Sequence, residues 1–95
     1  MLTGSEALGS ALGYKVIDTS ALTGDVDLIA IGGHGSAARG VRVLTVGSTP
    51  TLALATTSGP SGDAIPVAAG YEFPVQATKI LHAGTSGVTS VLAWW

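Results

Sequence analysis

A glycine-rich segment with a histidine and a serine, residues 32–36 (Gly-Gly-His-Gly-Ser), is the first place in this chain where chemistry could occur. Glycine-rich loops bind phosphate, and glycines beside histidine occur in oxyanion holes. A dinucleotide site needs Gly-x-Gly-x-x-Gly at the start of a helix, with an acidic residue about 20 positions later. Here a strand-like run begins within a few residues, at Gly40, and no Gly-Lys-Ser/Thr loop is present. The segment therefore predicts a flexible hairpin.

A serine triad is the second chemistry to consider, because the chain contains serines, two histidines and several aspartates. A nucleophilic serine in an elbow would sit in Gly-x-Ser-x-Gly. The segments that come nearest, residues 35–39 and 84–87, both lack that spacing. Function has to be argued from a site, and none is visible. We therefore expect no catalytic residues, no cofactor and no enzymatic activity.

Metal binding is the third possibility. His34 and His82 are not at ligand spacing, and the chain has no cysteine to join them. Asp25 and Asp27 alternate onto one face of an expected strand, where they could share a calcium ion. Calcium takes six to eight oxygen ligands, however, and this pair lacks the others. A solvated strand edge, where charge discourages aggregation, is the favoured role, so we expect no metal site.

Aromatic side chains could bind a partner through their large apolar surface. Trp94 and Trp95 are adjacent, and successive strand residues point to opposite faces. One indole can therefore enter the core while the other faces outward, where it would suit a subunit contact. The alternative is that both cover the edges of the core. Together with Tyr71, these two residues are the candidate interface residues.

Charge is unusually sparse in this sequence. Only 11% of its residues are Asp, Glu, Lys or Arg, whereas an ordinary domain has about 25%. Either Thr, Ser and Gly coat the exterior, or part of it is buried against partners, as in symmetric assemblies. The net charge is −2 with only four basic residues, which excludes a clustered basic footprint for nucleic acid. No run approaches the roughly 18 apolar residues of a membrane span, so no membrane partner is expected.

The elements that would position these residues are mostly strands. Strand candidates recur about every ten residues, with glycine- and proline-rich turns between them, which is typical of a sandwich or small barrel. We predict an all-β fold, a single small antiparallel β-sandwich of jelly-roll-like form with about six to eight strands. The candidate strands are residues 14–18, 25–31, 40–46, 51–56, 64–68, 71–83 and 88–95.

The start of the chain is expected to differ from the rest. In residues 1–13 the leucines are loosely spaced and two glycines weaken any helix. We interpret this stretch as an extended N-terminal arm that docks on a partner, and residues 14–95 as the single β domain.

The second half of the chain carries a recognisable succession of short motifs. Gly-Val-Arg-Val-Leu-Thr-Val-Gly (residues 40–47) is followed by Gly-Tyr-Glu-Phe-Pro-Val (70–75). Lys-Ile-Leu-His-Ala-Gly-Thr-Ser (79–86) and Val-Leu-Ala-Trp (91–94) come next. This order resembles the small head spike-base or capsid decoration proteins of gene transfer agents and related tailed bacteriophages. The resemblance covers about residues 39–95.

The resemblance implies a virion structural protein that has no catalytic residues. Such a protein would be assembled in the host cytoplasm and would lie on the capsid exterior, as a decoration protein or the base of a spike or fibre. Its partners would be the major capsid protein or a fibre or spike protein, with homo-oligomerisation. Two alternatives stay open: a tail, neck or baseplate β-module of a virion, and a carbohydrate-binding module that uses Tyr71, Trp94 and Trp95 as stacking platforms.

Overall fold

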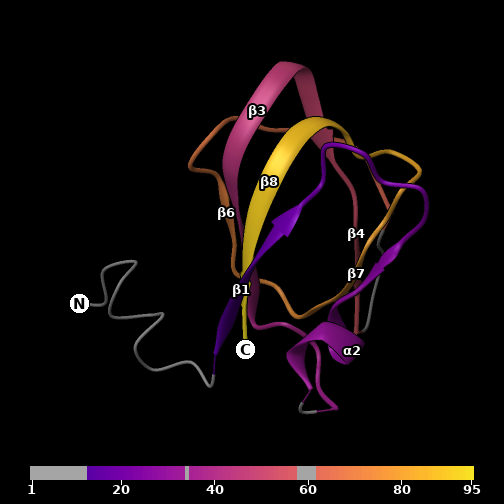
Figure 1. The fold of residues 1–95 in the computed structure, drawn as a ribbon, viewed down its shortest axis with the longest axis vertical. Helices are drawn as coiled ribbons and strands as arrows, with labels where there is room; N and C mark the ends of the chain where they lie inside the picture. The colour runs from indigo at the N-terminus through magenta and orange to yellow at the C-terminus, as the bar shows by residue number, and fades with distance from the viewer. Residues whose placement is uncertain (1–12, 34, 58–61) are drawn as a thin grey trace.

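The computed structural model describes residues 13–33, 35–57 and 62–95, and within these ranges the fold consists of two antiparallel β-sheets and one short helix (Figure 1). The helix, α2, spans Leu28–Gly32. The strands are β1 (Tyr14–Asp18), β2 (Val26–Asp27), β3 (Gly40–Leu52), β4 (Leu54–Thr56), β5 (Ile65–Pro66), β6 (Glu72–Phe73), β7 (Ala77–Ile80) and β8 (Ser86–Trp94).

The larger sheet is organised around the two longest strands, β8 and β3. Its order is β1-β8-β3-β5, and β6 also pairs with β3. Thr51 of β3 pairs with Pro66 of β5, whereas Val41 of β3 pairs with Phe73 of β6. The short strands β5 and β6 therefore follow one another along β3, on its side away from β8. The strand β1 forms the opposite edge of this sheet.

The smaller sheet has the order β2-β7-β4 and lies across the core from the larger one. The chain passes between the sheets at Ala53, a fully buried residue between β3 and β4. The amide of Ala53 donates to the hydroxyl of Thr85 over 3.1 Å, and its carbonyl accepts from the amide of Leu81 over 2.9 Å. These bonds satisfy the backbone where it leaves one sheet for the other.

The strand β3 is long because it arches over one end of the molecule (Figure 1). Val46 pairs with Val88 and Thr51 with Ser86, so five steps along β3 correspond to two along β8. The chain comes very close to itself here: a Cβ on Gly87 would lie 2.5 Å from the carbonyl oxygen of Ser48. Gly87 also has a φ of 72°, in the left-handed region. Both facts explain a glycine at this position.

The core lies between the two sheets and is almost entirely aliphatic. The larger sheet contributes alternate residues of β3 and β8, and the smaller sheet and the helix close the other side. Burying one such side chain stabilises the fold by about 1.5–3 kcal/mol. The fully enclosed residues with the largest side chains are Leu28, Leu52, Ile80, Val41, Val43, Val88 and Val91.

The prediction of a strand over residues 25–31 is wrong for most of that stretch. Only Val26–Asp27 is extended, and Leu28–Gly32 is helical. The carboxylate of Asp27 caps the helix by accepting from the amides of Ile29 (3.1 Å) and Ala30 (3.2 Å). Periodicity does not distinguish a strand from a helix in a short apolar run, and here the Asp27 cap favours the helix.

The prediction of a small all-β sandwich is confirmed, and eight strands lie in the described part of the chain. The candidate strand at residues 14–18 coincides with β1, and that at 88–95 lies within one or two residues of β8. The alternating stretch 51–56 belongs to two strands in different sheets. Nearly all of the predicted arm, residues 1–12, lies outside the described residues, as do His34 and residues 58–61 of the predicted turn.

Candidate interaction surface

The two aspartates considered as metal ligands accept hydrogen bonds from the backbone. Asp27 caps α2, and the carboxylate of Asp25 accepts from the amide of His82 over 2.8 Å. The two aspartates therefore hold separate backbone groups. Within the residues that the structure describes, no group of three or more His, Cys, Asp or Glu side chains is placed to hold a metal ion.

The glycine-rich segment forms the end of α2 and the connection to β3. Gly33 caps the helix in the left-handed conformation, with a φ of 72°. A Cβ on Gly32 would lie 2.3 Å from Nε1 of Trp95, so the missing side chain makes room for the indole. A helix precedes this segment, so it does not join two strands as the predicted hairpin would. The helix it adjoins ends here, whereas phosphate loops open a helix.

The adjacent tryptophans lie on opposite faces of the larger sheet. Trp95 belongs to the core between the sheets, where Nε1 donates to the main-chain carbonyl of Leu28 over 3.1 Å. Trp94 lies on the outer face, opposite Gly40 and Tyr14, and its indole lies over Gly40. Alternation along the strand therefore turns the two rings to opposite faces, which is one of the two arrangements that the sequence left open.

Both indoles are nevertheless largely covered within the chain. Trp94 is 8% exposed and Trp95 is 4% exposed, whereas Tyr71 is 52% exposed. The carbonyl of Tyr71 accepts from the amide of Val43, on the side of β3 away from β8. The three predicted interface residues are therefore not brought together into one stacking platform, and of the three Tyr71 alone is about half exposed.

An apolar surface that the sequence analysis did not identify lies on the outer face of the larger sheet. We call it the outer patch. The register pairs Tyr14 with Trp94 and Val16 with Leu92, so all four side chains share this face. Tyr14 is 67% exposed and Val16 is 53% exposed. The signal was present in the alternation of residues 14–18, but only the pairing with β8 shows which face is outward.

Little charge borders the outer patch. Arg42 pairs with Leu92 across the sheet, and its Nε lies 3.9 Å from the Glu72 carboxylate on β6. Both side chains are about two-fifths exposed, so this ion pair contributes little to stability. At the far end of β1, Asp18 accepts from the hydroxyl of Ser20 (2.6 Å) and from its amide (2.9 Å). These two hydrogen bonds lower the pKa of Asp18.

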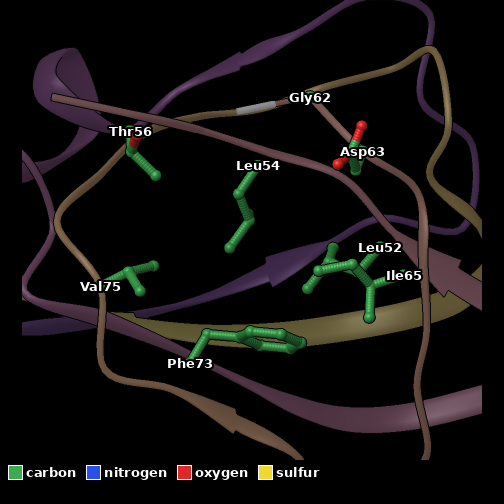
Figure 2. A pocket seen from close by; sticks show the side chains of 8 residues that line it. All are labelled: Leu52, Leu54, Thr56, Gly62, Asp63, Ile65, Phe73 and Val75. Atoms are coloured by element: carbon green, nitrogen blue, oxygen red, sulfur yellow. The ribbon is translucent and has the colours of Figure 1, made fainter. Parts of the chain in front are cut away.

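An apolar pocket opens at the other edge of the sandwich (Figure 2). Leu54, Phe73 and Val75 point into it, and Asp63 lies at its rim. Its volume is about 170 Å³, which suits one large apolar side chain better than an extended ligand. The residues that line it come from distant segments: Leu52, Leu54, Thr56, Gly62, Asp63, Ile65, Phe73 and Val75.

Comparison with known proteins returned no match to a family model, to a curated protein or to a solved structure. Among the described residues, no helix is long and apolar enough to span a membrane, and α2 has only five residues. The outer patch therefore combines two exposed apolar side chains, Tyr14 and Val16, with little charge around them.

Proposed function

We propose that this chain is a structural subunit of a virion. It is a decoration protein of the capsid exterior, or the base of a spike or fibre, and it acts through repeated protein–protein contacts. The outer patch is the observation that carries the proposal. Tyr14 and Val16 are 67% and 53% exposed, and both lie on the outer face of the larger sheet. Exposed apolar groups gathered on one face mark interaction sites.

Composition supports a surface covered by partners. Charged residues make up 11% of the chain, and charge is depleted in the centres of protein interfaces. A multi-copy assembly buries several faces of each subunit at once, which accounts for sparse charge over the whole molecule. The resemblance of residues 39–95 to head spike-base and decoration proteins selects the virion among possible assemblies, with the major capsid protein or a fibre protein as partner.

The tail, neck or baseplate module is the closest alternative, because it would use the same kind of surface at another place in the particle. The carbohydrate-binding alternative receives less support. It requires flat aromatic faces open to solvent, and Trp94 and Trp95 are 8% and 4% exposed.

Sedimentation with particles tests the proposal. The chain, carrying an affinity tag after Trp95, would be produced in cells that release particles, and the particles purified on a density gradient. We expect the chain to band with intact heads at many copies per particle, and to be reached by antibody on the capsid surface. Recovery with isolated tails would support the alternative module. Recovery only in the soluble fraction, with no particle-bound chain, would overturn the virion proposal.

A further inference from the structure

The strand β1 has one side of its backbone without a partner in the described structure. Among the described residues, it forms an edge of the larger sheet and pairs with β8 alone. The amide of Trp95 donates to the carbonyl of Gly13, and the amide of Thr19 donates to that of Thr89. In an antiparallel pair, the residues that exchange hydrogen bonds alternate with residues that do not. Lys15 and Ile17 therefore face β8.

The backbone amides and carbonyls of the remaining β1 residues point away from β8. Tyr14, Val16 and Asp18 are the residues whose backbone groups face the free edge, as the same alternation requires. Two of them also carry the exposed side chains of the outer patch. Aromatic and β-branched residues favour strands, and an exposed strand edge is a template for pairing with another chain.

We propose that two copies of this chain pair through β1, antiparallel and related by a two-fold axis, so that their larger sheets join into one continuous sheet. The inference rests on the proposed function, because it names the contact by which the subunit would associate with itself. An antiparallel contact between identical strands is self-complementary, which is the condition for a closed dimer.

The hydrogen-bonding pattern selects one register. Only residues that face outward can exchange bonds, so Tyr14, Val16 and Asp18 have to be matched with the same three positions of the partner. With the axis at Val16, this residue pairs with the partner's Val16, and Tyr14 pairs with the partner's Asp18. All three outward residues of each strand are then used, giving about six hydrogen bonds between chains. If the register shifted by two residues in either direction, only two of the three outward-facing residues of each strand would pair.

This register also unites the apolar surfaces. Val16 and the partner's Val16 meet on the outer face, with Tyr14 from each copy on either side, beside Leu92 and Trp94. The two outer patches become one stripe that crosses the axis. Lys15 lies on the opposite face, across from the partner's Ile17, and its side chain is long and exposed enough to reach solvent.

The contact is small, because a five-residue strand edge buries less than a standard interface. We therefore expect a dissociation constant between about 10 µM and 1 mM for the isolated chain. Many copies on one surface would strengthen the contact by raising the effective concentration.

A cysteine at the axis tests the register directly, since the chain has no cysteine of its own. Hydrogen-bonded antiparallel pairs have Cα atoms about 5.5 Å apart, within the range that a disulfide spans. We expect Val16→Cys to form a covalent dimer under mild oxidation. Ile65→Cys is the matched control, because Ile65 is 45% exposed in β5 at the opposite edge of the same sheet, and Val16 is 53% exposed. Equal cross-linking of both variants, or none at position 16, would overturn the proposal.

A charge at the axis provides a second, non-covalent test. Val16→Lys places two ammonium groups directly opposite each other across the two-fold axis, and like charges in that position repel. We expect the dimer seen by light scattering near 1 mM to weaken at least tenfold. Ile65→Lys, at the opposite edge of the same sheet and 45% exposed, should leave it unchanged. Circular dichroism would verify that both variants fold.

The outcomes separate this inference from the proposed function. A wild-type chain that stays monomeric up to about 1 mM but still bands with particles would overturn the β1 contact and leave the virion role standing. A chain that cross-links through position 16 but never bands with particles would keep the dimer and remove the virion role. If Val16→Lys leaves the strength of the dimer unchanged, the contact between copies lies outside β1 and the proposal is wrong.

Discussion

The indole of Trp95 donates a hydrogen bond from Nε1 to the main-chain carbonyl oxygen of Leu28 over 3.1 Å, which ties the residue after β8 to the first residue of α2. The two residues are 67 positions apart in the chain. Both are buried, so the carbonyl has no access to water that could replace the indole. This bond fixes the helix against the open end of the sandwich.

We expect Trp95→Phe to destabilise the fold by about 1–3 kcal/mol, because it leaves a buried carbonyl without its donor. The free energy of unfolding in urea measures the effect. Trp94→Phe is the comparison, since it makes the same change of ring on the other face of the sheet. A loss at position 94 as large as that at position 95 would show that ring size, and not the hydrogen bond, determines the cost.

Gly40→Ala should destabilise the protein by about 1–3 kcal/mol, the usual cost of overpacking. A Cβ at Gly40 would lie 2.2 Å from the indole of Trp94, which packs closely against this glycine. Gly47→Ala is the matched control in the same strand, because the nearest atom to its Cβ would be 3.8 Å away. Thermal unfolding of both variants should show a clear loss at position 40 and little change at position 47. Equal melting temperatures would contradict the packing of Trp94 described above.

Asp27→Ala should cost about 0.5–2 kcal/mol, since the amides of Ile29 and Ala30 lose the carboxylate that accepts from them. Asp27→Asn keeps an oxygen acceptor at the same position and should retain most of the stability. Amide hydrogen exchange would locate the effect, with faster exchange confined to α2 and its neighbours. Uniform loss of protection across both sheets would argue against a local capping role.

The carboxyl group of Asp18 should titrate below its usual range, because the hydroxyl and amide of Ser20 both donate to its charged form. A pKa lowered in the folded state adds stability above the unfolded pKa, and this stability is lost as the pH falls through the folded pKa. We expect Ser20→Ala to raise the pKa of Asp18 toward 3.8, as measured by NMR titration. The wild-type chain, titrated under the same conditions, is the reference.

The sequence predicted the class of fold and several of its strands from local signals. Residues 14–18 coincide with β1, and glycine- and proline-rich stretches separate most of the strands found. The opposite orientations of Trp94 and Trp95 also followed from the sequence, because neighbouring side chains on a strand point to opposite faces. These features depend on residues that are close together in the chain.

Other features depended on contacts between distant residues. Leu28–Gly32 is a helix where a strand was predicted, since a cap from Asp27 and room for Trp95 outweigh an ambiguous apolar run. The pocket lined by Leu54 and Phe73 could not be predicted, because its residues come from three separate segments.

The sequence by itself determined that this chain forms strands with little charge and no visible catalytic signature. The tertiary structure decided which strand became an edge and which face turned outward. Tyr14 and Val16 alternate with Lys15 and Ile17 in the sequence, but alternation alone does not say which pair lies on the core side of the sheet. Pairing of β1 with β8 places Ile17 toward the core and leaves Tyr14 and Val16 exposed. That choice is made by the register between segments more than 70 residues apart, which no local pattern encodes.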